Sequence, residues 1–494
     1  MLKRLSCLLL CLLFVASVML LSACDKEGDD KSGTAGNTDV SGFLNPEKVW
    51  NEEVNILTFK NEAYAFSYCQ VDAEDIVDEP VNDAFYERNA IIEEKYGIDI
   101  NAIYPDTEED YIQLLKDDMI SGSNEYDCII GQIGYTAPLV LEGLFYDLNE
   151  LPNEYLHLDE EWWDQTLIDQ TSINGNVYFV SGDALVEDDE ATWAMFFNKD
   201  LANTYGIESP YDIVRDGRWT FDTMHELIQQ VSLTHGAQKS FDPSVGDIWG
   251  MVAQSYDFLL FMQGAGQTIV DNSGEEPVLR VDEERNISVF MEFTNMMYDE
   301  ENVGIADRHG YWEDMYAWET KIFANGNALF MPYSISLVSS PEIRDAEIRY
   351  GLLPMPKADD IQENYTTGIN VYHYPIIAIP TSNVDKLDVT CYALEAMAYY
   401  GKELVTEEYY ERTLTYKRFT DDDSRDMLDL IFRNRTYDLG TIFNFHGGDN
   451  DGALYFYVGL IGELKTDIVS HYESKKNSYQ AGLDTLIEQC YAGN

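Results

Sequence analysis

The chain has 494 residues, of which 45% are hydrophobic, so it is long enough and apolar enough for two or three domains' worth of packed core. Its 90 acidic and 31 basic side chains give a formal net charge of −59. A negative field of this size disfavours nucleic acid and anionic lipid surfaces as partners. Most carboxylates, including the acidic run 187–190, are expected to be solvated.

The first 24 residues have the pattern of a secretory signal that ends in a lipid-anchoring cysteine. Two basic residues precede an uncharged, mostly apolar run over 5–23. The stretch Leu21-Ser22-Ala23-Cys24 resembles the bacterial lipobox, whose cysteine receives a diacylglycerol and becomes the new N-terminus. We therefore expect a signal peptide over 1–23, lipidation at Cys24 and a flexible polar tether over 24–48. The alternative is an uncleaved membrane anchor, since the run is near the lower limit for a span, roughly 17 residues.

The segment after the tether alternates strand and helix patterns. Short apolar, β-branched runs predict strands over 54–59, 98–104 and 126–131. Helices are predicted between them, because apolar residues recur on one helical face and Gly97 and Gly122 follow as C-terminal stops. This alternation is typical of a parallel α/β sheet with right-handed connections.

Mixed elements follow. Thr136 is expected to cap a short helix that ends at Gly143, Asn174-Gly175 suits a type I′ hairpin turn, and Thr220 is a predicted helix N-cap. Strands are predicted within 191–198, 323–335, 350–354 and 373–380, and helices within 199–207, 220–231, 287–299 and 387–404. The last third is mostly helix and loop.

Four cysteines remain after the signal and the lipobox: Cys69, Cys128, Cys391 and Cys490. They allow three disulfide pairings, and the sequence does not choose among them. Because Cys128 lies inside an apolar strand pattern, a buried free thiol suits it as well as a bridge.

Five segments, in the same order along the chain, resemble the family 1 extracellular solute-binding proteins of ABC importers, which include the maltose-binding type. The second contains the phrase Asn198-Lys199-Asp200 of the family's hinge region. The segments are NEYDCIIGQIGYTAPLVLEGLFYDLNEL, NGNVYFVSGDALVEDDEATWAMFFNKDLANTYGI, RWTFDTMHEL, FANGNALF and YGLLPMPK. The resemblance extends over residues 50–410.

The resemblance implies a two-lobed, periplasmic-binding-protein-like α/β fold, with interleaved lobes joined by hinge strands and a ligand cleft between them. The first lobe is expected over 49–188 plus 368–412, and the second over 189–367 plus 413–494. The chain is then expected to cross between the lobes near 180–192, 365–374 and 410–415.

The chain has 34 Tyr and 8 Trp residues. Flat aromatic faces bind the C–H faces of sugar rings, and carboxylates accept hydrogen bonds from the sugar hydroxyl groups. Most Tyr and Trp residues in an α/β protein, however, belong to the core or to a half-buried surface. Positions after a strand end, at a lobe crossing or in a Gly-flanked loop, as we expect for Trp249, are better candidates. The predicted ligand-binding residues are Tyr135, Trp163, Asp183, Asp189, Trp193, Trp249, Tyr311, Trp312, Tyr333, Tyr372 and Tyr374.

The resemblance implies three partners: a small solute, expected to be an oligosaccharide; the membrane subunits of an ABC permease; and the lipid bilayer, through Cys24, on the extracytoplasmic face of the cell membrane. A secreted polysaccharide-acting enzyme, such as a glycosidase or lyase, and a surface adhesin are the alternatives. The sequence has no HExxH, GxSxG, Walker or GxGxxG motif. We predict no catalytic residue, cofactor or metal site.

Overall fold

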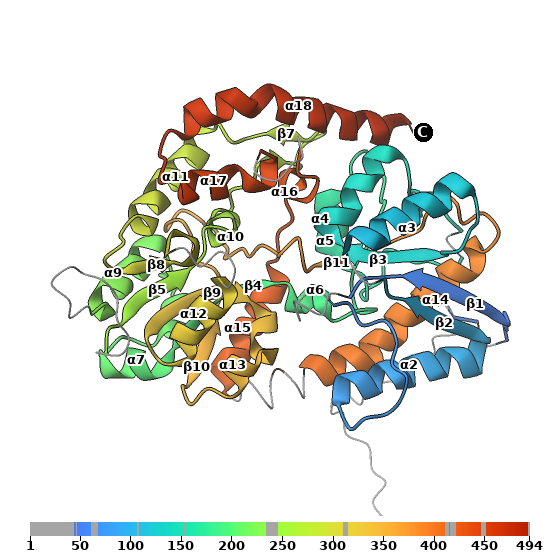
Figure 1. The fold of residues 1–494 in the computed structure, drawn as a ribbon, viewed down its shortest axis with the longest axis horizontal. Coiled ribbons are helices and arrows are strands. Elements are labelled where there is room, and N and C mark those ends of the chain that lie inside the picture. The colour runs from blue at the N-terminus through green and yellow to red at the C-terminus, as the bar shows by residue number, and fades with distance from the viewer. Residues whose placement is uncertain are drawn as a thin grey trace, which may run out of the picture. The chain divides into compact units, whose positions relative to one another are not determined.

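Two β-sheets organise the protein in the computed structural model (Figure 1). The structure describes residues 44–492 apart from 46, 61–67, 106–107, 153, 234–245, 310–314, 411–413, 415–420 and 446–450. All of them belong to one compact unit, Phe43–Asn494. The predicted signal peptide, Cys24 and most of the tether lie outside the described residues. No helix of the described part combines the length and the apolar character that a membrane span requires.

The first sheet has the strand order β11-β3-β1-β2. The strands β1 (Glu52–Leu57), β2 (Ile98–Ile103) and β3 (Cys128–Gln132) are parallel, and β11 (Pro375–Ala378) runs antiparallel to β3. Helices α2 (Pro80–Tyr96) and α3 (Glu108–Ser121) connect the parallel strands, as predicted. Gly97, at φ 64°, caps α2 in the left-handed conformation that favours glycine. Helix α14 (Leu387–Tyr400) packs beside α2 and against β1 and β2 (Figure 1).

The second sheet has the order β10-β4-β9-β5-β8. Its strands are β4 (Trp193–Asn198), β5 (Trp249–Ala253), β8 (Val303–Ile305), β9 (Ala328–Ser334) and β10 (Tyr350–Leu353). Thr220 caps α9 (Phe221–Val231), as predicted, and accepts a hydrogen bond from Thr223 N. The sheet is further covered by helices α7 (Lys199–Thr204), α8 (Pro210–Arg215), α11 (Glu284–Met297), α12 (Met315–Ala324) and α15 (Asp422–Arg433). Helix α10 (Asp257–Gly264) follows β5 and packs against α17 (Phe456–Gly462).

Shorter elements complete the described part. They are α4 (Ile133–Thr136), η2 (Ala137–Glu142), η3 (Leu148–Glu150), α5 (Gln165–Thr171), α6 (Glu187–Glu190), β6 (Val270–Asp271), β7 (Val278–Leu279), η5 (Ala306–His309), η6 (Ile335–Ser339), α13 (Pro341–Arg344), η7 (Gly401–Thr406), α16 (Leu439–Ile442), η9 (Ala453–Tyr455) and α17 (Phe456–Gly462). Asn174 and Gly175 both have positive φ in a turn closed by the bridge between Ile173 and Asn176, as the hairpin prediction requires.

The chain passes between the two sheets more than once, so each sheet defines a lobe made of separate chain segments. Val180 bridges Ile377 in the first lobe, and thirteen residues later Trp193 starts β4 of the second lobe. On the return passage, Ile369 bridges Thr192 before β11 joins the first sheet. The fold is therefore the predicted two-lobed, interleaved α/β architecture with hinge strands. The lobe boundaries given above stay predictions.

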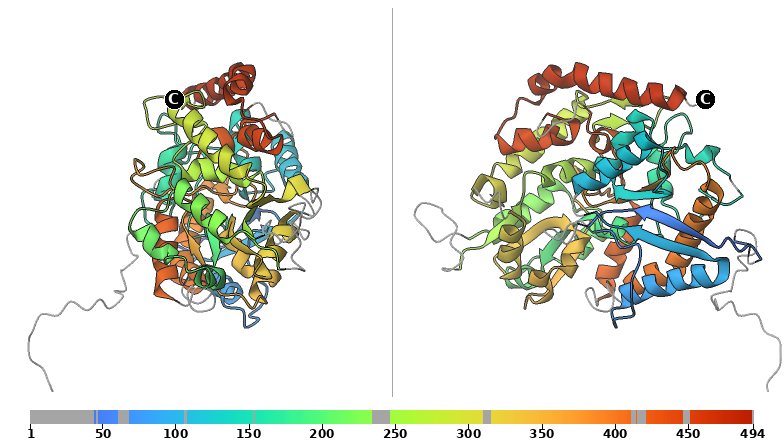
Figure 2. Two further views of the ribbon diagram at one scale, coloured as in Figure 1. Left: turned by 90° about the vertical axis from the view of Figure 1, so that its left-hand side faces the viewer. Right: turned by 45° about the vertical axis from the view of Figure 1, so that its right-hand side comes forward.

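The C-terminal helix α18 (Ile468–Ala492) contacts both lobes (Figure 2). Near its start it packs against α11 and β7 of the second lobe, where Lys476 forms an ion pair with Asp282. Near its end it packs against η2 of the first lobe, where Gln489 lies close to Gly143. At about 1.5 Å per residue, 25 residues span roughly 37 Å, which is enough to reach from one lobe to the other.

Three local predictions are wrong. The acidic run 187–190 is the short helix α6, and Glu187 and Asp188 are buried, because a guanidinium and backbone N–H groups stabilise carboxylates there. Thr136 caps no helix, since its hydroxyl pairs with that of Tyr111 instead. Trp249 lies in strand β5, where it pairs with Ala328, and not in a loop. The four remaining cysteines are free and buried.

Candidate functional site

Tyr135 and Tyr372 meet where the first lobe joins the hinge. Tyr135 lies in α4, directly after the carboxyl end of β3, and its side chain is 40% exposed. The backbone N–H of Gly134 donates to Val371 O over 2.9 Å. A Cβ at position 134 would approach that oxygen to 3.1 Å, so glycine permits the close approach. The approach places the rings of Tyr135 and Tyr372 with centroids 5.4 Å apart.

The second lobe brings three further rings to the same place. Trp193, at the start of β4, is stacked on Tyr333 of β9, with centroids 5.7 Å apart and planes at 15°. Tyr256, just before α10, contacts Trp193 edge to face at 6.2 Å and Tyr372 at 6.3 Å. Antiparallel pairing of β4 with β9 sets the stack, since Tyr333 is opposite Ala194 and next to the partner of Trp193.

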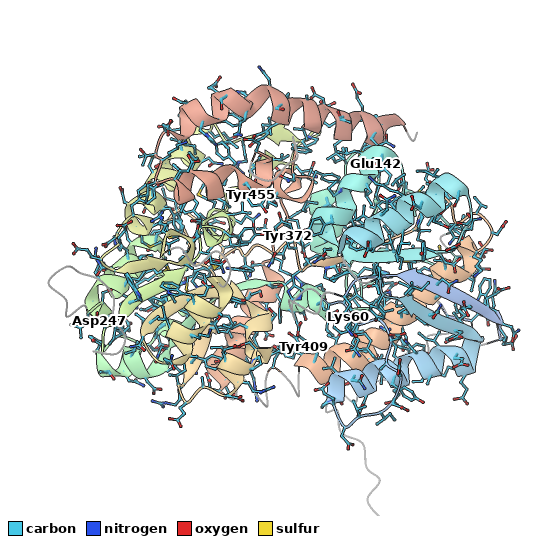
Figure 3. The ribbon with its side chains drawn as sticks, viewed as in Figure 1. Lys60, Glu142, Asp247, Tyr372, Tyr409 and Tyr455 are labelled. Carbon is cyan, nitrogen blue, oxygen red and sulfur yellow. The ribbon has the colours of Figure 1, made fainter. Side chains whose placement is uncertain are left out.

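A sixth ring completes this group, which we name the interlobe aromatic cluster. The hydroxyls of Tyr372 and Tyr455 are hydrogen-bonded, and Figure 3 shows the two side chains close together between the lobes. Tyr256, Tyr372 and Tyr455 are half-buried, whereas Trp193 and Tyr333 are almost completely covered. The cluster therefore runs from an exposed rim at Tyr135 to a closed base at Trp193.

Buried polar groups lie behind the base of the cluster. The backbone N–H of Gln254 donates to Asp257 Oδ2 over 2.7 Å, and its side-chain amide donates to Glu319 Oε1. Burial raises the pKa of both carboxyls well above the usual range; the negative charge of Asp257 adds to the effect at Glu319, and Trp193 partly offsets it at Asp257.

A second polar group lies at the lobe crossing itself, and we name it the hinge network. The guanidinium of Arg435 reaches three carboxylates: Asp189 at 3.0 Å, Asp164 at 3.3 Å and Asp188 at 3.6 Å. Tyr437 also donates a hydrogen bond to Asp164. The backbone ties these groups to the crossing strands, because Thr367 N donates to Asn434 O over 3.0 Å.

Two of the predicted ligand residues, Asp189 and Tyr374, are members of the hinge network. The hydroxyl of Tyr374 lies 3.2 Å from Asp164 Oδ2 and 2.9 Å from the hydroxyl of Tyr437. Burial is the main cause that raises the pKa of Asp189, and Arg435 partly offsets it. Burial and the nearby carboxylates also raise the pKa of Asp188, and Arg435 partly offsets this effect.

The other predicted ligand residues lie elsewhere. Asp183 accepts a hydrogen bond from Thr406, and burial raises its pKa to about 7. Trp163 is buried beside Glu395 in the first lobe, and Trp249 is buried against Gly304 in the second. Tyr311 and Trp312 fall outside the described residues. The structure thus brings four predicted residues together: Tyr135, Trp193, Tyr333 and Tyr372.

Sequence reasoning missed Tyr256 and Tyr455. Tyr256 follows β5, a strand parallel to its neighbours β8 and β9, by three residues. The rule that selected Tyr135, a position just after the carboxyl end of a parallel strand, would have found it. Tyr455 lies in a C-terminal 3₁₀ turn whose sequence carries no such signal.

Sequence comparison defines the class of protein. Residues 72–382, more than half of the chain, match the family described as bacterial extracellular solute-binding protein. The chain belongs to this family. No curated protein sequence matches the chain significantly.

Solved structures agree in fold. An ABC substrate-binding protein of Listeria monocytogenes in complex with cycloalternan is similar at 15% identity and a TM-score of 0.54, over 88% of this chain and 99% of that one. The GacH receptor of Streptomyces glaucescens, solved unliganded and with acarbose, is similar at 14% identity and a TM-score of 0.53, over 88% and 98%. UgpB of Mycobacterium tuberculosis, in complex with glycerophosphocholine, is similar at 16% identity and a TM-score of 0.56, over 84% of this chain and 99% of that one. At these identities the likeness concerns the fold.

Proposed function

We propose that this protein is a lipid-anchored solute-binding protein of an ABC importer, which binds an oligosaccharide at the interlobe aromatic cluster and delivers it to a membrane permease. The observation that carries the proposal is the continuous contact of rings from Tyr135 in the first lobe, through Tyr372, to Tyr256 in the second. A ligand that covers these rings contacts both lobes at once, which favours the closed arrangement of the lobes.

The chemistry of the cluster suits a sugar. Three half-buried tyrosines and the exposed Tyr135 offer ring faces for the C–H side of a pyranose, and their hydroxyls offer donors and acceptors for its rim. The similar proteins whose structures contain cycloalternan or acarbose support this ligand class. UgpB, with glycerophosphocholine, indicates that the fold alone does not select it.

A screen of neutral oligosaccharides, including cycloalternan and acarbose, tests the proposal. We expect saturable thermal stabilisation by at least one sugar, no reaction product by chromatography, and a smaller radius of gyration in small-angle scattering when that sugar is bound. Product formation would instead favour the polysaccharide-acting enzyme. An unchanged scattering profile at calorimetrically confirmed saturation would contradict closure of the lobes.

The anchor has a separate test. The lipobox at Leu21-Ser22-Ala23-Cys24 motivates it. In cells fed radiolabelled palmitate, the wild-type chain is expected to be labelled and to sediment with membranes, and the variant Cys24→Ala is expected to do neither. Labelling of Cys24→Ala at the wild-type level would contradict lipidation at this residue, without bearing on solute binding.

A further inference from the structure

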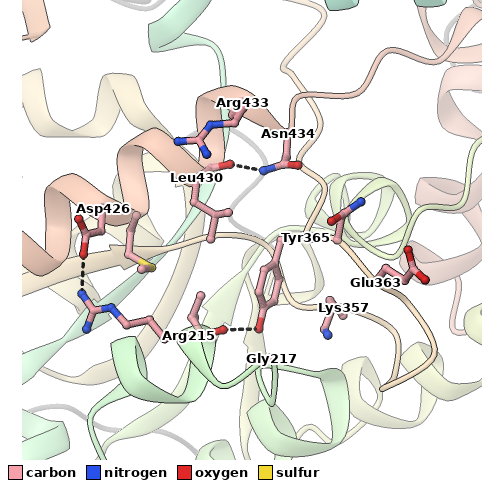
Figure 4. A pocket seen from close by; sticks show the side chains of 12 residues that line it. Arg215, Gly217, Lys357, Glu363, Tyr365, Asp426, Leu430, Arg433 and Asn434 are labelled. Carbon is pink, nitrogen blue, oxygen red and sulfur yellow. Dashed lines mark hydrogen bonds and ion pairs between the residues drawn. The ribbon is translucent and has the colours of Figure 1, made fainter.

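A pocket of about 450 Å³ opens in the second lobe, apart from the interlobe aromatic cluster (Figure 4). Helix α8, the segment 357–365 that follows β10, and helix α15 form its walls. Its charged lining residues are Arg215, Lys357, Glu363, Asp426 and Arg433. Three bases with two acids reverse the balance of the whole chain, in which acidic residues outnumber basic ones 90 to 31.

Lys357 is the unusual member of this pocket. The residue is only 5% exposed, yet within the described part of the chain its ammonium group has no ion pair and no hydrogen bond. Removal of an ammonium group from water is unfavourable unless an opposite charge or hydrogen-bond acceptors replace the water. A buried lysine that lacks a carboxylate partner therefore stands out, the more so in a chain with so many acidic residues.

The neighbours of Lys357 hold it in place without neutralising it. Its Nζ lies 5.2 Å from the ring centroid of Tyr365, a contact that partly stabilises the cation. The Tyr365 hydroxyl donates to Val214 O over 3.0 Å and lies 3.3 Å from Trp219 N, so the ring is fixed. The ammonium group is therefore positioned in advance of any ligand.

The acids of the pocket are engaged or exposed. Asp426 accepts a hydrogen bond from Arg215 Nη2 over 2.8 Å, and the same guanidinium contacts Asp423 at 2.5 Å. Figure 4 shows Arg215 and Asp426 across the pocket from Lys357, on the other side of the Tyr365 ring. Glu363 is exposed at the mouth. The positive charges of Lys357 and Arg433 thus remain available to a ligand.

We propose that this pocket binds a small oxyanion, either a carboxylate or a phosphate group, through the ammonium of Lys357, with Arg433 at the rim. An ammonium is a compact three-fold donor that pairs well with such groups, and a guanidinium pairs with two oxygens of one group. The volume exceeds that of an inorganic ion, so the pocket also accommodates an organic acid or a phosphate monoester.

The site is distinct from the one under the proposed function. Lys357 and Arg433 belong to the second lobe only, and none of the six aromatic residues of the interlobe cluster lines the pocket. A sugar-binding test therefore fails or succeeds independently of an anion-binding test.

The test is calorimetric titration of the purified protein with inorganic phosphate and, separately, with acetate and citrate, against sodium chloride of equal ionic strength. The wild type is expected to bind phosphate or a carboxylate saturably at one site. The tighter of the two classes identifies the ligand chemistry. Lys357→Met, which keeps the length of the stem and removes the charge, is expected to weaken binding roughly tenfold or more. Lys465→Met, at an exposed surface lysine, is the matched control and is expected to bind as the wild type does.

Two results would overturn the proposal: a wild type that binds neither anion beyond the chloride control, or a folded Lys357→Met variant that binds as well as the wild type. Arg433→Gln gives a second route if Lys357→Met fails to fold, because Arg433 is exposed and its loss leaves the core intact. We expect Arg433→Gln to weaken anion binding several-fold, and unchanged binding in that variant would also count against the proposal.

Discussion

Tyr372 and Tyr374 are two residues apart on the same lobe crossing, yet their surroundings differ sharply. Tyr372 is half-buried and contacts the rings of Tyr135 and Tyr256. Tyr374 is completely buried, and its hydroxyl lies within hydrogen-bonding distance of Asp164 and Tyr437 in the hinge network. Tyr372 keeps a partly exposed ring that a ligand can cover, although its hydroxyl is hydrogen-bonded to that of Tyr455, whereas Tyr374 has no exposed surface. The surroundings of each side chain, and not its residue type or its position along the chain, decide which of the two tyrosines is accessible to a ligand.

The largest effect is expected from loss of the cation in the hinge network. Arg435→Met leaves Asp164, Asp188 and Asp189 buried without their shared guanidinium. Removal of one partner of a buried ionic group typically destabilises a protein by about 3–5 kcal/mol. Chemical denaturation at pH 7 measures the loss. A change below about 1 kcal/mol would show that protonation or water compensates, and that the network contributes little.

Trp193→Ala tests the closed base of the aromatic cluster. Trp193 is only 2% exposed and is stacked on Tyr333, so its truncation opens a cavity. We expect a loss of roughly 3–5 kcal/mol in unfolding free energy, as for a core tryptophan. Ligand affinity of the surviving folded fraction is then the second measurement. Unchanged stability together with weak binding would instead place the ring in direct contact with the ligand.

Tyr372→Ala is expected to act on binding. Its ring is half-buried between the lobes, and a residue central to a binding site contributes about 2 kcal/mol or more when it is a hot spot. About 2 kcal/mol corresponds to nearly thirtyfold weaker binding of the oligosaccharide found in the screen. Calorimetry measures affinity, and a thermal melt without ligand shows whether stability changes. A variant that melts far below wild type but binds the sugar normally would show that Tyr372 contributes to stability and not to ligand binding.

Tyr374→Phe is the matched change in the hinge network. It keeps the ring and removes the hydroxyl that is shared with Asp164 and Tyr437. Loss of a hydrogen bond to a buried charged group destabilises a protein by roughly 1.5–3 kcal/mol. Because Tyr437 still donates a hydrogen bond to Asp164, we expect a loss of unfolding free energy at the low end of this range. Sugar affinity is expected to stay at the wild-type value. A weaker sugar affinity with an unchanged melting temperature would show that Tyr374 takes part in ligand binding.

Asp183→Asn is expected to change how the stability of the protein depends on pH. Burial raises the pKa of Asp183 to about 7 from its ordinary value of 3.8. Between these two values the folded state binds more protons than the unfolded state, so this carboxyl makes stability fall as pH rises from about 4 to 7. In melting curves from pH 5 to 8, the melting temperature of Asp183→Asn should rise relative to that of the wild type as pH increases.

Asp200→Asn serves as the control for that experiment. Hydrogen bonds from Arg349 lower the pKa of Asp200, so its proton uptake falls below the pH range of the melts. The difference between Asp200→Asn and wild type should therefore be constant from pH 5 to 8. An equally constant difference for Asp183→Asn would contradict the raised pKa of Asp183.

Local rules predicted much of the fold. The alternation of β1, α2, β2, α3 and β3 follows from hydrophobic periodicity with glycine stops, and both Gly97 and Gly122 have positive φ after their helices. The cap at Thr220 and the turn at Asn174-Gly175 were predictable for the same reason, since each depends on a few neighbouring residues. The acidic helix α6 was not predictable in this way, because its burial depends on Arg435, nearly 250 residues away.

The amino-acid sequence was enough to predict the α/β class, the two-lobed family architecture and the candidate aromatic residues at the hinge. Which of these aromatic residues lie together depends on the tertiary structure. Tyr135 meets Tyr372 because Gly134 lets two backbones approach, and Trp193 meets Tyr333 because two antiparallel strands are paired in one register. The tertiary structure also decided that Lys357 is buried beside Tyr365 without a carboxylate. These ring contacts and this burial arise between segments far apart in the chain, so residue spacing along the sequence does not predict them.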